Sequence, residues 1–435
     1  MATTRLTRTN SQSPTLARKG TISLWFKVTE VLTGGSDRWL LGTYTNGNNM
    51  FYIYLRNTGQ LGIIQIESGS GYYSYITNKK LLDNSAWYHL VLAWDTSVST
   101  ATDRTKLYIN GERITSFATQ TNIPQNYGIR FSDNNLPLFI GGVNGYQTHY
   151  NGLMSHVYYA DGTDYAPTVF GETDSTTGEW SIKTSPSFTV GNNGFTILKD
   201  GNTITDQSSN SNNWSVQAGA VTKTLDCPDN VFCTLNPLIS TVPTTGTNNN
   251  TTGTLTNGNL TWTSTNAVWN SRGSGTIFVS TGKFYWEVKM NSGSDFNAFC
   301  GIANQTVANQ RFDATMGYGG NYSYYKNGQK YIGSSASNYG ASWAAGDIIG
   351  VALDVTNSKL YFSKNGTFQN SGNPASGSTG TGAIPITANI EYAPRVTIHY
   401  MGMSFNFGNG FFGTTAITTN SGNGYAGAEG ASKFN

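Results

Sequence analysis

The sequence predicts an all-β protein made of two jelly-roll-type antiparallel β-sandwiches in tandem. Charged residues make up only 11% of the chain, against about 25% in typical soluble domains, which disfavours helices with charged outer faces. The 51 glycines suit tight turns between strands. Short runs in which apolar and polar residues alternate have the period of a half-buried strand. At 435 residues the chain is too long for a single core.

Residues 1–165 form the first predicted sandwich. In the run 21–28, one set of alternating side chains is apolar and predicted to face the core, namely Ile22, Leu24, Phe26 and Val28. The other set comprises Ser23, Trp25 and Lys27 and is predicted to face away from the core. Further strand-like runs follow to residue 159, separated by Asn-Gly, Gly-Gly and Ser-Gly turns.

Residues 166–255 are predicted to form a packed connector that bridges the two sandwiches. The alternation weakens there, yet Trp180, Phe188, Phe195 and Trp214 are too many aromatic residues for a solvated linker. A polar, threonine-rich and asparagine-rich run near residue 250 marks the next boundary. The last segment, 413–435, is polar and rich in glycine and is predicted to have little core of its own.

Residues 256–412 form the second predicted sandwich. In the run 283–290 the residues Phe284, Trp286, Val288 and Met290 alternate with polar ones. The two sandwiches share a pattern: an apolar strand ends at an acid, and a hairpin returns through Lys-Leu-Tyr to Asn-Gly, at 95–111 and at 354–366. Asn-Gly favours a type I′ turn, in which both residues take positive φ.

Composition limits the partners that we expect. A net charge of +2 gives no field that would capture nucleic acid or an anionic membrane. No stretch has the ~18 apolar residues of a membrane helix, and the first residues lack the apolar core of a secretory signal. Cys227, Cys233 and Cys300 are too few and too irregular for a disulfide framework, which indicates assembly in a reducing cytoplasm.

The motifs of both sandwiches resemble known families. The runs GTISLWFKV, SAWYHLVLAWDTS and KLYINGERI, with the closing strands FIGG and GLMSHVYYADG, resemble the laminin-G/concanavalin A-like lectin-glucanase fold over about residues 5–165. The runs GKFYWEV, CGIAN, GDIIGVALD and LYFSKNG resemble the SPRY domain over about residues 265–410. Both resemblances imply β-sandwiches.

The order of these domains, with the segments FGETDSTTGEW, SSNSNNWSV and DCPDNVFCTLNP, is similar to a virion protein family of marine and environmental tailed phages. That resemblance implies a structural or adhesion protein of the virion, such as a tail fibre or surface appendage, assembled in the host bacterial cytoplasm. Its expected partners are other virion proteins, further copies in a homo-oligomer, and host surface polysaccharide. The alternatives are a capsid decoration protein that clamps shell subunits and a concanavalin-fold glycoside hydrolase.

Two tyrosine clusters are candidates for ligand binding, because aromatic rings stack on the apolar faces of sugars. They contain Tyr72, Tyr73 and Tyr75 in the first sandwich, and Tyr318, Tyr322, Tyr324, Tyr325 and Tyr331 in the second. Packing within a sandwich or between subunits is the alternative that we favour, since tyrosine is also common at protein interfaces.

Candidate groups for metal binding and catalysis are few. The acids Asp95, Asp133, Asp161 and Asp164 are candidate calcium ligands, because relatives with the laminin-G fold often hold an ion at the rim of the sandwich; no other cofactor is expected. Turn formation is the ordinary role of such loop acids. We predict no enzymatic activity: Glu172 and Asp174 lack the third acid of a glucanase strand.

Overall fold

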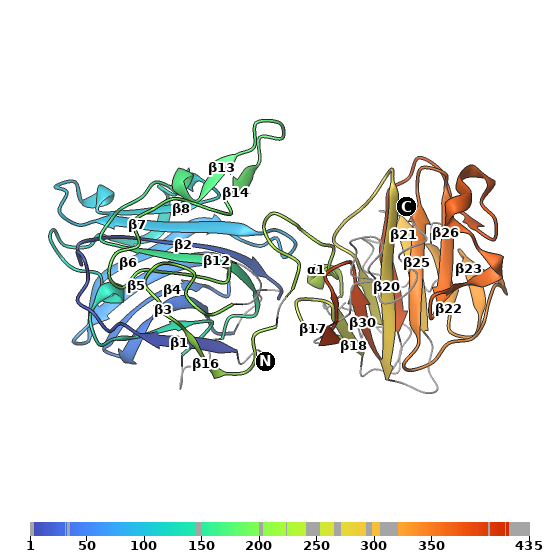
Figure 1. The fold of residues 1–435 in the computed structure, drawn as a ribbon, viewed down its shortest axis with the longest axis horizontal. Coiled ribbons are helices and arrows are strands. Elements are labelled where there is room, and N and C mark those ends of the chain that lie inside the picture. The colour runs from blue at the N-terminus through green and yellow to red at the C-terminus, as the bar shows by residue number, and fades with distance from the viewer. Residues whose placement is uncertain are drawn as a thin grey trace. The chain divides into compact units, whose positions relative to one another are not determined.

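The computed structural model describes residues 4–30, 32, 35–143, 149–199, 203–222, 224–240, 253–264, 271–292, 298–304, 321–398, 401–413 and 415–416. The chain divides into two compact units, and each is described by itself (Figure 1). The first unit comprises residues 1–223 and 227–231, and the second comprises residues 224–226 and 232–435. Both are built almost entirely from antiparallel β-sheet, as the sequence predicts.

The first unit is a sandwich of two large sheets. The eight-stranded sheet has the order β10 (Phe117–Thr121), β6 (Ser70–Lys80), β5 (Gln60–Glu67), β4 (Asn49–Leu55), β3 (Arg38–Asn46), β11 (Pro137–Ile140), β1 (Arg5–Thr9) and β16 (Ser215–Ala218). The six-stranded sheet has the order β15 (Phe195–Ile197), β12 (Gly152–Asp161), β2 (Lys19–Val28), β7 (Tyr88–Asp95), β8 (Thr105–Ile109) and β9 (Glu112–Arg113). Short 3₁₀ turns are η1 (Ala101–Asp103), η2 (Arg130–Ser132) and η3 (Pro167–Val169).

The core of the first unit lies between these sheets. Ile22, Leu24, Phe26 and Val28 of β2 all point into it, which confirms the predicted inward row. The opposite row of β2 is buried as well, because a small hairpin covers it. This hairpin pairs β13 (Gly171–Thr173) with β14 (Trp180–Ile182) and contributes Trp180 and Ile182 to a cluster with Trp25 and Trp87. The prediction of a half-buried strand is therefore wrong for β2.

The structure differs from the predicted connector. Residues 166–223 belong to the first unit, where β15 adds to β12 and β16 adds to β1. Phe195 and Trp214 enter the same core as the β2 row. Residues 232–240 belong to the second unit, where Leu235 joins the core and α1 (Pro237–Ser240) follows. Phe195 and Trp214 therefore complete the core of the first sandwich, whereas Trp180 and Phe188 pack in separate clusters outside it.

The second unit is also a sandwich. Its eight-stranded sheet follows the order β17 (Gly253–Thr256), β18 (Thr261–Ser264), β30 (Gly402–Asn406), β20 (Lys283–Ser292), β25 (Ile348–Asp354), β26 (Lys359–Lys364) and β27 (Thr367–Phe368), with β28 (Ile384–Pro385) also paired to β26. Its six-stranded sheet follows the order β19 (Ser271–Ser274), β29 (Tyr392–Ile398), β21 (Ala298–Asn304), β22 (Asn321–Tyr325), β23 (Gln329–Ile332) and β24 (Ser335–Asn338). The remaining elements are η4 (Gln369–Ser371), η5 (Pro374–Thr379), β31 (Phe411–Phe412) and β32 (Thr415–Ala416).

The pattern shared by the two sandwiches forms equivalent hairpins. In the first unit β7 pairs with β8, and in the second β25 pairs with β26. Each hairpin reverses at Asn-Gly with positive φ at both residues, 50° and 79° at Asn110 and Gly111, and 47° and 80° at Asn365 and Gly366. The type I′ turns predicted from Asn-Gly are confirmed.

Part of the prediction lies outside the described residues. This applies to most of the polar run near residue 250 and to residues 417–435 of the glycine-rich segment. Within the part of the chain that the structure describes, no helix has the length and apolarity to cross a membrane.

Candidate functional site

The tyrosines predicted as ligand contacts of the first sandwich pack inside it. Tyr73 and Tyr75 lie on β6 with 0% and 3% of their surface exposed, in the core between the two sheets. Burial raises the pKa of both phenols, so they stay protonated at neutral pH. A sugar cannot stack on rings that the core already covers. The side chain of Tyr72 lies outside the described residues.

The second tyrosine cluster is divided between the two faces of its sheet. Tyr322 and Tyr324 lie in the core of the second unit. Tyr325 and Tyr331 are partly exposed on the opposite face, where they pack with Phe299 at ring-centroid distances of 4.3 and 5.2 Å. Tyr318 lies outside the described residues. The structure thus gives the described members packing roles.

Three of the four candidate calcium ligands already have partners. Lys19 Nζ lies 2.6 Å from Asp95 Oδ2, and Lys106 Nζ lies 3.6 Å from Asp164 Oδ2. Asp161 Oδ2 accepts backbone N–H bonds from Thr15 and from a second residue, Asn193. Ammonium groups and amide N–H groups therefore neutralise these carboxylates in place of a cation.

The fourth acid, Asp133, follows η2 and is partly buried. Its carboxyl group has a pKa raised to about 6, chiefly by burial; the charge of Arg130 opposes this rise and the charge of Glu67 adds to it. Nearby, the buried amide oxygens of Asn10 and Asn193 have no hydrogen-bond donor. Among the described residues, no group of three or more His, Cys, Asp or Glu side chains is placed to hold a metal ion.

One histidine with hydrogen-bonded neighbours has the appearance of a catalytic group. His89 on β7 lies 2.8 Å from Ser23 Oγ and 2.9 Å from Trp180 Nε1, and Trp25 stacks on its ring at 4.6 Å. Indole N–H can only donate, so His89 Nδ1 accepts from Trp180 and the ring proton of the neutral imidazole lies on Nε2. His89 therefore donates to Ser23.

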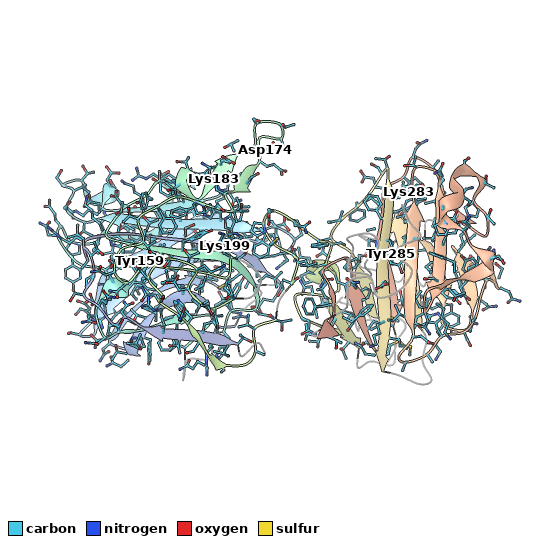
Figure 2. All side chains as sticks on the ribbon, viewed as in Figure 1. Tyr159, Asp174, Lys183, Lys199, Lys283 and Tyr285 are labelled. Carbon is cyan, nitrogen blue, oxygen red and sulfur yellow. The ribbon has the colours of Figure 1, made fainter. Side chains whose placement is uncertain are left out.

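This polarity is the reverse of what an activated serine requires, because a general base must accept the hydroxyl proton. His89 and Ser23 are both fully buried, and burial lowers the pKa of the imidazole to about 3. The group instead fastens the β13–β14 hairpin to the sheet, while Asp174 lies at the far end of that hairpin (Figure 2). Its role is structural.

The eight-stranded sheet of the first unit carries a second apolar surface on the side away from the core. We call it the aromatic face; it comprises Trp39, Tyr44, Met50, Tyr52, Tyr54, Ile64, Ile66, Ile76 and Phe139. On β4 the residues Phe51, Ile53 and Leu55 enter the core, so the alternating set Met50, Tyr52 and Tyr54 lies on the other side.

Strand register assembles this face from neighbouring strands. Tyr52 lies opposite Gly42 of β3 and Ile64 of β5, and the row continues through Ser74 of β6 to Thr121 of β10. Antiparallel partners share a face of the sheet, so these side chains lie side by side. Trp39 stacks on Tyr52 at 4.3 Å with nearly parallel rings, and Tyr44 packs edge-on against Trp39.

Exposure on the aromatic face is graded. Trp39 is only 2% exposed beneath its neighbours, whereas Tyr44, Tyr52, Ile64, Ile66 and Ile76 are partly exposed. Gly62 explains how Tyr54 lies flat on the sheet, since a Cβ at this glycine would lie 2.2 Å from the phenol ring. Two partly exposed aromatic rings on rigid strands, Tyr44 and Tyr52, are suited to stacking against a flat apolar ligand surface.

The sequence predicts a strand over the run 49–57 but does not show the role of its second row. The signal was present: Met50, Tyr52 and Tyr54 are apolar or aromatic, although the alternating positions of a half-buried strand are ordinarily polar. An apolar second row indicates either that another segment covers it or that it binds a ligand, and sequence alone does not distinguish the two.

Comparison with protein families gives two matches. Residues 3–163 match the concanavalin A-like lectin/glucanases superfamily, and residues 283–391 match the SPRY domain. The first match covers the strands of the aromatic face. No curated protein matches the sequence.

Solved structures give partial similarities. The SPRY domain of human HERC1 is 17% identical, over 35% of this chain and 91% of that chain, with a TM-score of 0.27. Stonustoxin is 17% identical, over 40% of this chain and 27% of its own, with a TM-score of 0.30. A heptameric SAP-like pentraxin from Limulus polyphemus is 15% identical, over 38% of this chain and 73% of its own, with a TM-score of 0.28.

Proposed function

We propose that this chain, in which a concanavalin A-like domain precedes a SPRY domain, is a bacteriophage virion protein of structure or adhesion. In this proposal the first domain contacts host-surface polysaccharide through its aromatic face. The observation that carries the proposal is the row of partly exposed rings and aliphatic side chains on rigid strands. The order of sequence motifs, similar to that of the tailed-phage family, supports the virion role.

Several properties of the aromatic face fit a saccharide. Sugar rings present flat C–H surfaces that stack on Tyr or Trp, and hydroxyl groups need nearby polar partners. Thr7 and Ser74 lie in the same row across the strands as Tyr52, and both are partly exposed. Repeated copies on a particle would turn weak contacts into strong attachment without any catalytic group.

A binding experiment on the purified full chain tests the saccharide contact. Exchange of both Tyr44 and Tyr52 for alanine should weaken binding on an array of bacterial surface glycans by about 10-fold, since each ring contact is worth roughly 0.5–1.5 kcal/mol. The matched control is Tyr325→Ala, a partly exposed and stacked ring in the second unit, which should bind like wild type. Absence of binding across the array, or equal loss in both variants, overturns the proposal for this face.

Two further measurements test the role in the particle. Mass spectrometry of purified virions should detect the protein, and a dozen or so copies would place it in the tail. Copies in the hundreds would instead favour the capsid decoration alternative. The uncharged, exposed edge strand β24 would then contact the shell subunits. New reducing ends in polysaccharide incubated with the protein would overturn the non-enzymatic assignment in favour of a glycoside hydrolase.

A further inference from the structure

An arginine and a histidine lie at one corner of the aromatic face. Arg5 precedes Thr7 by two residues on β1, and Thr7 lies opposite Phe139 of the face, so Arg5 shares that side of the sheet. His149 forms an isolated β-bridge with Trp39. Arg5 Nη1 lies 2.9 Å from His149 Nε2. The pair therefore adjoins Trp39 and Phe139.

This hydrogen bond determines the protonation state and the tautomer of His149. Guanidinium groups only donate, so His149 Nε2 must accept and the ring proton lies on Nδ1. Burial lowers the pKa of His149, and the charge of Arg5 lowers it further. A neutral imidazole leaves the positive charge of Arg5 uncompensated and offers one more N–H donor.

Within the described part of the chain, Arg5 forms an ion pair with no carboxylate. Its Nε–H is buried without an acceptor, which costs free energy, and it is closed to solvent and so to a ligand. Arg38 of the same unit shows how the Nε–Nη2 edge of a guanidinium group ordinarily binds a carboxylate. Its Nε lies 2.6 Å from Glu30 Oε1, and its Nη2 lies 2.9 Å from Glu30 Oε2. The equivalent edge of Arg5 lacks this carboxylate.

We propose that Arg5 and His149 bind the carboxylate of an acidic sugar whose ring packs against Tyr44 and Tyr52. The Nη N–H groups of Arg5 and the Nδ1–H of His149 are the donors for this carboxylate, because a charged acceptor forms strong hydrogen bonds with a guanidinium group. This assignment rests on the proposed saccharide binding and specifies its ligand as a uronate-containing polysaccharide. The rings provide contact area, and Arg5 selects for the acid group.

The experiment compares polygalacturonate with its methyl ester, in which the acid is neutral and the sugar ring is unchanged. Wild-type protein, measured by isothermal titration calorimetry, should bind the acid at least ~10-fold more tightly than the ester. Arg5→Gln should remove this preference and retain binding to the ester. Arg18→Gln is the matched control, since Arg18 is also an arginine of the first unit that donates to a neutral group, the side chain of Asn126, and it should retain the preference.

Arg5→Lys covers the case in which Arg5→Gln fails to fold, because it keeps the charge but loses the planar edge; it should show an intermediate preference. Binding of acid and ester with equal affinity overturns the assignment of Arg5 while the proposed saccharide binding stands. Binding of neither by folded wild-type protein, with neutral glycans bound on the array, also overturns only the uronate assignment. Absence of binding to every polysaccharide overturns both proposals.

Discussion

Replacement of His89 by glutamine should reduce the loss of folding stability that the first unit undergoes at acidic pH. Burial lowers the pKa of His89 from 6.5 to about 3 in the folded protein, whereas the unfolded chain has the ordinary value. Between these values the unfolded state binds one proton that the folded state does not, so stability is full above pH 6.5 and falls as the pH falls.

The magnitude follows from the two pKa values. Each pH unit below 6.5 costs about 1.4 kcal/mol, which gives a loss of roughly 2 kcal/mol at pH 5. Because pH 5 lies well above the folded-state pKa, the loss of stability at pH 5 depends little on the exact value of that pKa. Glutamine does not titrate in this range, so His89→Gln should lose about 2 kcal/mol less than wild type between pH 7.5 and pH 5.

Urea unfolding followed by tryptophan fluorescence at several pH values measures this difference, since Trp25 and Trp180 lie against the His89 ring. His149→Gln is the control: it also removes a histidine, but one that is partly exposed, so it should change the pH dependence less. Parallel curves for wild type and His89→Gln would show that His89 takes up a proton in the folded state. The hydrogen-bond polarity derived for Ser23 and Trp180 would then be refuted.

Four other substitutions test the structure. Asp133→Asn should stabilise the protein at pH 7.5 by about 1–2 kcal/mol, after allowance for solvent screening, because burial penalises the ionised carboxylate above its folded-state pKa of about 6. This gain in stability should vanish below about pH 4. Equal unfolding midpoints of wild type and variant at pH 7.5 would contradict the prediction. Asp206→Ala should cost about 3 kcal/mol or more, since this buried carboxylate accepts hydrogen bonds from three backbone N–H groups and a serine hydroxyl. Asp174→Ala, which removes similar contacts at the exposed end of the β13–β14 hairpin, should lower stability far less than Asp206→Ala in the same denaturation assay. Trp180→Ala should expose residues 171–183 to limited proteolysis, because that ring is wedged against Gly111 and Gly171 and bonded to His89; an unchanged cleavage rate would argue against this anchor.

Features decided by local chemistry were predictable from the sequence. The inward row of β2 follows from period-two alternation, and the turn at Asn110 and Gly111 follows from the preference of those residues for positive φ. Both depend on neighbours within a few residues. The all-β class and the two sandwiches follow from the same local signals repeated along the chain.

The candidate site was not predictable in the same way. Tyr73 and Tyr52 have the same side chain on neighbouring parts of one sheet, yet Tyr73 is fully buried in the core and Tyr52 is partly exposed on the aromatic face. Which row of a strand faces the core depends on the register of its partners, and a shift of one residue exchanges the two rows.

The sequence by itself determined the strands, their turns and the apolar row that each offers to a core. Only the tertiary structure decided which segments cover the second rows. Trp180 returns over Trp25 of β2, whereas Tyr52 of β4 stays partly exposed, stacked on Trp39. The physical reason is that burial depends on contacts between residues far apart in the chain, whereas strand and turn preferences depend on near neighbours.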